Sequence, residues 1–150
     1  MIHFHSVLPE IAQREVRCVH LSAVPGVTPS SSLSAGEYAF VEFYCEDLNC
    51  DCRRVFLQVI ARHHQDKVLA SINYGWEKES FYRMSWDSDA PRQIVRGSLD
   101  PINQQSEHAE ELLELFQRHV LDKAYRRRLQ RHHQLFRDEL RRRGHVEPSK

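Results

Sequence analysis

The stretch Glu37-Tyr-Ala-Phe-Val-Glu-Phe-Tyr-Cys-Glu-Asp-Leu-Asn-Cys-Asp-Cys-Arg-Arg-Val-Phe-Leu-Gln-Val-Ile-Ala61 contains the pattern that decides the fold. Its two apolar runs, Tyr38–Tyr44 and Val55–Ala61, are rich in aromatic and β-branched residues, which predicts two β-strands. The polar segment between them is short, so the two strands are expected to pair antiparallel. Three of the four cysteines of the chain lie in this connecting segment, at Cys45, Cys50 and Cys52.

Further strands are expected on both sides of this pair. Residues Glu15–Val24 mix valine and leucine with polar residues, and Lys67–Tyr74 forms another apolar run that ends at Gly75. The aromatic segment Phe81–Trp86 is expected to form a short edge strand. Residues 25–32 are dense in proline, glycine and serine, which predicts a loop. Short connections between consecutive strands favour an antiparallel meander.

After Pro101 the pattern becomes helical. Ser106 is a suitable N-cap for a first helix, Asp122 is suitable for a second, and Gly144 is expected to end it. Apolar residues and one histidine recur at helical spacing, at Leu112, Leu115, Phe116 and Val120 and then at Tyr125, Leu129, His132, Phe136 and Leu140.

The order of these elements predicts a single α+β domain over residues 1–150. It is expected to contain an antiparallel sheet of four or five strands, with two C-terminal helices packed on one face. Residues 1–100 are expected to be rich in strands, residues 105–143 to be helical and residues 144–150 to form a frayed tail.

Composition favours a small globular protein of the cytoplasm. Hydrophobic residues make up 41% and charged residues 28% of the 150 residues, which is usual for a globular domain. No apolar run approaches the roughly 20 residues that a membrane-spanning helix needs. The N-terminal residues lack the pattern of a secretory signal, so the four cysteines are expected to be reduced or bound to metal.

The three neighbouring cysteines predict a zinc site, because Zn²⁺ binds thiolates in a tetrahedron of four ligands. The alternative is three reduced thiols in a half-buried turn. His63 and His64 lie about 36 Å from Cys52 if the intervening residues are extended. Cys18 and His132 are therefore the two candidates for the fourth ligand, because pairing of the first strand or packing of the last helix could bring either one near.

Two short motifs resemble a family of uncharacterised bacterial proteins. They are Cys45-x4-Cys50-x-Cys52-Arg53 and Leu129-x-Arg131-His132-x-x-Leu135-Phe136. Some related proteins carry a C-terminal SEC-C motif, a short zinc-binding tail, but this chain lacks the cysteines of that motif. The resemblance implies no known activity. It does single out His132, which favours His132 over Cys18 as the fourth ligand.

The last helix is strongly basic. Residues 122–150 carry a net charge of +6 although the whole chain is neutral, and eight arginines lie between Arg126 and Arg143. Such a helix could bind nucleic acid weakly through phosphate contacts. The residues expected to do so are Arg126, Arg127, Arg128 and Arg131. The alternative is that the arginines are solvated or paired with acidic residues of the preceding helix.

The function that these patterns favour is a zinc-stabilised, non-catalytic interaction module, with a protein as its possible partner. A nucleic-acid-associated protein and a zinc- or cysteine-dependent enzyme are the alternatives. The chain contains no glycine-rich phosphate loop, no Gly-x-Ser-x-Gly and no His-Glu-x-x-His. The enzyme alternative therefore depends on the cysteines themselves.

Overall fold

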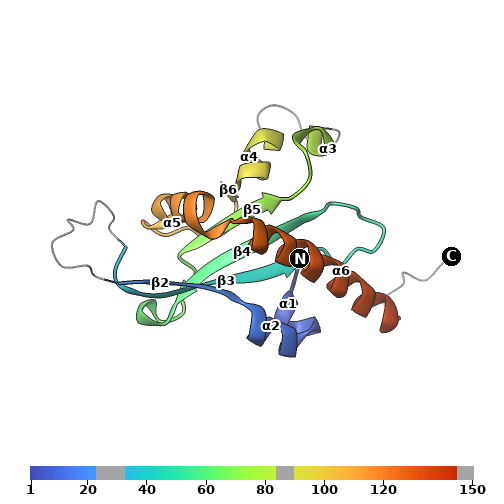
Figure 1. Ribbon diagram of the computed structural model, residues 1–150, viewed down its shortest axis with the longest axis horizontal. Coiled ribbons are helices and arrows are strands. Elements are labelled where there is room, and N and C mark those ends of the chain that lie inside the picture. Colours follow the sequence, from blue (N-terminus) through green and yellow to red (C-terminus); the bar gives the residue numbers. More distant parts are fainter. Residues whose placement is uncertain (23–32, 84–89, 145–150) are drawn as a thin grey trace.

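The computed structural model describes residues 1–22, 33–83 and 90–144, which form an α+β fold (Figure 1). The strands of its sheet are β1 (Ile2–His3), β2 (Arg17–Leu21), β3 (Gly36–Tyr44), β4 (Arg54–Ala61), β5 (Ala70–Gly75) and β6 (Ser98–Leu99). All their pairings are antiparallel, in the order β1-β3-β4-β5-β6, and β2 also pairs with β3. The predicted fold class is confirmed. Among the described residues the sheet has six strands, whereas four or five were expected. The difference arises because β1 and β6 are only two residues long and could not be recognised in the sequence.

Helices occur at both ends of the chain and also between the strands. They are α1 (Phe4–Val7), α2 (Pro9–Glu15), the 3₁₀ turn η1 (Arg62–His64), α3 (Glu79–Arg83), α4 (Ala90–Arg96), α5 (Ala109–Leu115), the π-helical turn η2 (Phe116–Val120) and α6 (Lys123–Arg142). Within the described residues, no helix is long and apolar enough to cross a membrane.

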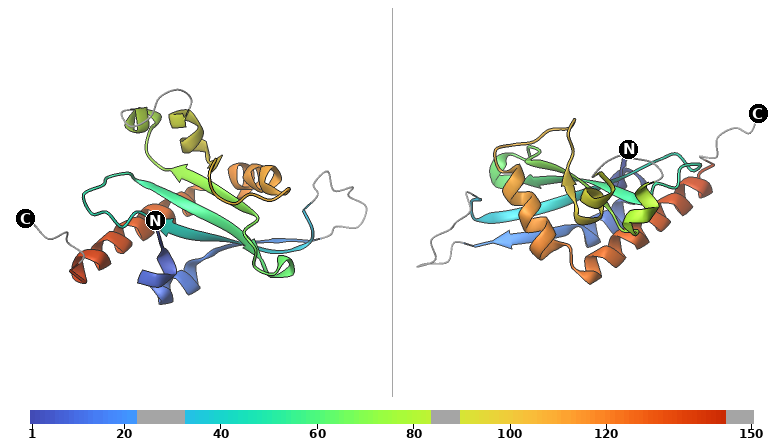
Figure 2. Two further views of the ribbon diagram at one scale, coloured as in Figure 1. Left: turned by 180° about the vertical axis from the view of Figure 1, so that it is seen from behind. Right: turned by 90° about the horizontal axis from the view of Figure 1, so that it is seen from above.

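One face of the sheet forms the core. Side chains of β3 are buried at every second position, as expected for a strand with one face on a core. The register aligns Phe40 with Val59 of β4, and Val59 with Ala70 of β5, so these buried side chains form a continuous row across the sheet. The helices α5 and α6 run along this same face (Figure 2). Phe116 packs against Phe40, and both rings are completely buried.

The second C-terminal helix begins where the sequence predicted. Asp122 caps α6, with its Oδ1 accepting a hydrogen bond from the backbone N–H of Tyr125 at 2.8 Å. Gly144, at φ +75°, follows the end of the helix, as expected for a glycine after a helix C-terminus. The first helix begins later than expected, at Ala109, because the hydroxyl of Ser106 donates to Leu69 O and accepts from His108 N in the preceding turn.

The segment Phe81–Trp86 was wrongly predicted as a strand. Residues 79–83 form α3, and residues 84–89 lie outside the described residues. Tyr82, one of the aromatic residues that suggested a strand, has another role. The Tyr82 hydroxyl donates to Arg53 O at 2.6 Å, and its ring lies against Gly75, where an added Cβ would come within 2.3 Å of the hydroxyl.

The N-terminal segment also differs from the prediction. Residues Glu15–Val24 were expected to form one strand, but β2 spans only Arg17–Leu21, and residues 23 and 24 lie outside the described residues. The end of β3 near Tyr44 is paired with β1 instead, through Ile2. Elements of two to seven residues, such as β1, α1 and α2, are too short to show periodicity in the sequence.

Candidate metal centre

The cysteine loop, residues 45–53, connects the two central strands β3 and β4. Its first part is a tight turn, in which Asp47 O accepts from Cys50 N at 3.0 Å and Asp47 Oδ1 accepts from Asn49 N at 2.9 Å. Its last residue, Arg53, has a positive φ of +45°, and two hydrogen bonds of 2.9 Å join its guanidinium to the Asp51 carboxylate. These contacts fold the loop back on itself, so its cysteines approach one another.

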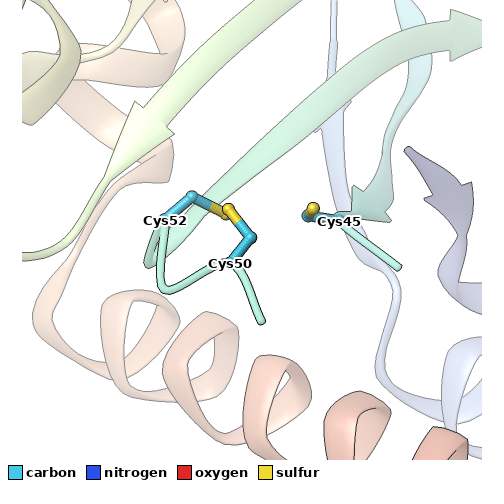
Figure 3. Close-up of side chains that lie close together, drawn as sticks. All are labelled: Cys45, Cys50 and Cys52. Atoms are coloured by element: carbon cyan, nitrogen blue, oxygen red, sulfur yellow. The ribbon is translucent and has the colours of Figure 1, made fainter. Parts of the chain in front are cut away.

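The loop brings three thiols together. Within the described residues, the Sγ atoms of Cys45, Cys50 and Cys52 lie within 4.8 Å of one another (Figure 3). Sulfurs at the corners of a zinc tetrahedron are about 3.8 Å apart when each lies about 2.3 Å from the metal. Small movements of the side chains would therefore suffice to hold a metal ion. All three cysteines are half-buried and form no disulfide.

The same surroundings make the thiols of Cys45 and Cys50 poor nucleophiles. Burial raises the pKa of the Cys45 thiol above its usual value, and the neighbouring Cys50 thiol raises it further. Burial also raises the pKa of Cys50, with a further contribution from Cys52. The thiolate is the reactive and metal-binding form, so these thiols are protonated at neutral pH and lose their protons on binding a metal.

Arg137 of α6 holds the loop against the helix. It was expected on a basic surface, but only 9% of the residue is exposed. Its guanidinium donates to Cys50 O and to Leu48 O, each at 2.8 Å. The cysteine loop is thus attached to the last helix through the backbone of the segment that carries its central thiol.

His132 has other partners than the thiols. It is completely buried, with Nδ1 at 2.7 Å from Glu42 Oε1 and Nε2 at 3.0 Å from Glu15 Oε1. Phe4 stacks on its ring, with the centroids 4.6 Å apart. The Tyr44 hydroxyl also donates to Glu42 Oε1, at 2.6 Å. Both ring nitrogens of His132 are therefore engaged by carboxylates, and no group of potential ligands found in the described residues includes it.

Cys18 lies away from the other cysteines. The expected antiparallel pairing of β2 with β3 is present, but its register places Cys18 opposite Ala39. Ala39 is six residues before Cys45 on the same strand, which corresponds to about 20 Å. Since β1 occupies the edge of β3 near Tyr44, Cys18 cannot reach the loop. Burial, with a hydrogen bond to Glu37, raises the pKa of Cys18 to about 11.

Sequence reasoning missed His133. Its residue is 8% exposed, and its Nε2 atom is buried without a hydrogen-bond partner. Burial, followed by the charge of Arg137, lowers the pKa of His133 to about 4, so the imidazole is neutral at pH 7. The helical spacing of the sequence did indicate which side of the helix His133 occupies. His133 lies four residues after Leu129 and four before Arg137, so all three occupy one side of the helix.

Many arginines of the basic helix α6 pair with other groups of the same chain. Arg128 donates to Glu15 O at 3.1 Å, and Arg131 pairs with the Glu15 carboxylate. Near the end of α6, Asp138 and Glu139 pair with the arginines at positions 141, 142 and 143. The carboxylate partners of these arginines lie on α2 and on α6 itself, and Arg143 also donates to Val7 O at 2.8 Å. Arg126 and Arg127 are exposed.

Two cavities are lined by residues of other elements than the cysteine loop. Their volumes are about 490 and 580 Å³, and both are lined by α4 and α5, with shared residues that include Arg96, Glu110 and Gln117. Neither cavity has a cysteine in its lining, and the charges around them are of both signs.

Comparisons of the chain with models of protein families, with curated proteins and with solved structures found no match. The resemblance to bacterial proteins related to those with a SEC-C motif therefore stays a prediction that rests on its two short motifs.

Proposed function

We propose that this protein is a small zinc-stabilised, non-catalytic interaction module. The observation that carries the proposal is the convergence of the Sγ atoms of Cys45, Cys50 and Cys52 within 4.8 Å, in the loop between the two central strands. Thiolates are soft ligands that suit Zn²⁺. A metal at this place would fix the cysteine loop, and through Arg137 it would also stabilise the contact with α6.

A structural role fits the surroundings of the thiols better than a catalytic one. Catalytic zinc needs an open coordination position beside a substrate pocket, whereas structural zinc is closed by protein ligands. The two cavities described above are lined by other elements, and the thiols of Cys45 and Cys50 have raised pKa values. The zinc- or cysteine-dependent enzyme is therefore the less favoured alternative. Reduced thiols that hold zinc are typical of the cytoplasm, which is the location we propose.

The test is metal content together with a matched pair of cysteine variants. Protein expressed with added zinc is expected to hold about one zinc per chain, as measured by elemental analysis. Cys50→Ser is expected to lose that zinc and to melt at a lower temperature, because metal binding is coupled to folding. Cys18→Ser is the control, since Cys18 lies opposite Ala39 and outside the group of three thiols. Wild-type protein that binds no zinc, or equal zinc loss in both variants, would overturn the proposal.

A further inference from the structure

Among the described residues, a buried histidine nitrogen near the cysteine loop lacks a hydrogen-bond partner. This atom is His133 Nε2, in a residue that is only 8% exposed. A buried polar atom left without a partner costs roughly 1–3 kcal/mol. Nearly all such atoms in folded proteins have a protein, water or ion partner, so an exception calls for an explanation.

The surroundings of His133 place its ring beside the loop. The ring centroid lies 5.7 Å from that of Tyr44, the residue immediately before Cys45. The charges that act on the imidazole include those of Asp51 and Arg53, the two residues that flank Cys52. The ring thus lies beside the start of the cysteine loop, and charges at the end of the loop act on it.

The geometry of α6 separates His133 from its neighbour His132. Consecutive residues of an α-helix point about 100° apart, so the two imidazoles face different parts of the protein. His132 faces the carboxylates of Glu42 and Glu15. His133 lies one helical turn before Arg137, whose guanidinium bonds the carbonyls of the cysteine loop. Of the two histidines, it is therefore His133 that shares with Arg137 the side of the helix on which the loop lies.

We infer that His133 Nε2 is the fourth zinc ligand and completes a closed site with Cys45, Cys50 and Cys52. This inference rests on the proposed function, because it adds a ligand to the same metal. In the structure, the group of atoms within 4.8 Å of one another contains the three cysteines and not His133. Zinc holds imidazole nitrogen at about 2.0–2.1 Å. Metal binding therefore draws the cysteine loop and the His133 ring together, and the metal becomes the partner of the unpartnered nitrogen.

The test compares His133→Asn with His132→Asn, two identical substitutions at adjacent positions. Zinc affinity is measured by competition with a chelator, and Co²⁺ is used as a spectroscopic probe of the ligand set. His133→Asn is expected to weaken zinc binding at least about tenfold, by analogy with the loss seen when groups that support a metal site are removed. It is also expected to shift the Co²⁺ d–d bands while the thiolate charge-transfer band remains. His132→Asn is expected to leave the Co²⁺ spectrum unchanged.

A second measurement needs no variant and decides the matter if either variant fails to fold. Wild-type protein labelled with ¹⁵N is loaded with ¹¹³Cd²⁺, and coupling of the metal to a histidine ring nitrogen is recorded by NMR. Coupling to His133 Nε2 is the expected result. Coupling to His132, or to no histidine in a protein that still binds cadmium through its cysteines, would overturn the inference and leave the proposed function intact. Absence of metal binding in the wild-type protein would overturn both.

Discussion

At the scale of single residues, a cluster of hydrogen-bonded ionisable side chains joins three parts of the chain. Glu42 of β3, His132 of α6 and Glu15 at the end of α2 are joined by contacts of 2.7 and 3.0 Å through the imidazole. Glu42 and His132 are buried, and a buried polar group is tolerated only where it is hydrogen-bonded. Arg131 supplies a further positive charge at Glu15. The N-terminal helices are therefore attached to the last helix by paired polar groups as well as by apolar contact.

The carboxyl of Glu15 makes the stability of the protein sensitive to acid. The hydrogen bond from Arg131, aided by the one from His132, lowers the pKa of Glu15 from 4.5 to about 2. A carboxyl whose pKa is lower in the folded state contributes stability above its unfolded pKa and loses it as the pH falls through the folded one. Between pH 4.5 and 2, we therefore expect a loss of about 1–2 kcal/mol from this group, reduced by its partial exposure.

Glu15→Gln tests this expectation. The variant should be less stable than the wild type at pH 6 and should lose less stability between pH 4.5 and 2, as measured by urea unfolding. Glu10→Gln is the control, because Glu10 is exposed on the same helix. Parallel pH profiles for the wild type and Glu15→Gln would show that this carboxyl has no such role.

At the scale of elements, the sequence identifies those with strong periodicity. Burial alternates along β3, and α6 has its apolar stripe and its predicted cap at Asp122, so both were predicted correctly. The short helix α3 was not, because five residues rich in aromatic side chains show no period of 3.6 and are equally typical of a strand. The register of β2 could not be predicted either, since it depends on β1 occupying the end of β3.

Arg137 provides the test at this scale, because it connects α6 with the cysteine loop. Arg137→Met keeps much of the apolar stem but removes both hydrogen bonds to the loop carbonyls. We expect a loss of about 2 kcal/mol in the free energy of unfolding, since hydrogen bonds to charged groups contribute about 1.5–3 kcal/mol each and the carbonyls regain some water. Amide hydrogen exchange in residues 48–50 should also become faster.

Arg141→Met is the matched control for this variant. Arg141 lies four residues further along the same helix, is exposed, and pairs with Asp138 at 3.2 Å. Exposed pairs of this kind contribute at most about 1 kcal/mol. If both variants lose the same stability, then Arg137 does not fasten the loop.

At the scale of the whole molecule, the candidate site joins residues that are far apart in the sequence. The thiols lie on one short loop, so their spacing alone predicted their convergence, and the structure confirms it. The neighbours contributed by α6 follow more than 80 residues later, and their orientation depends on how that helix crosses the sheet. The periodicity of α6 restricts the choice to a few positions, but it does not distinguish the side of Glu42 from the side of the loop. That distinction required the packed structure.

The charge of the whole molecule leads to the last prediction, which concerns nucleic acid. Most arginines of α6 already have carboxylate or carbonyl partners, whereas Arg126 and Arg127 are exposed to solvent. We therefore expect only weak, non-specific binding of RNA or duplex DNA, with Kd of about 1–100 µM at physiological salt and a steep weakening as salt is raised. Fluorescence anisotropy at two salt concentrations measures this binding.

Replacing Arg126 and Arg127 by Glu should weaken the binding. The control replaces Arg62 and Lys67 by Glu, which changes the charge by the same amount. Both residues are exposed just after the end of β4, and this change should have a smaller effect. Submicromolar binding that only the first pair of substitutions abolishes would make nucleic acid the main partner, because no non-specific contact of two arginines reaches that affinity at physiological salt.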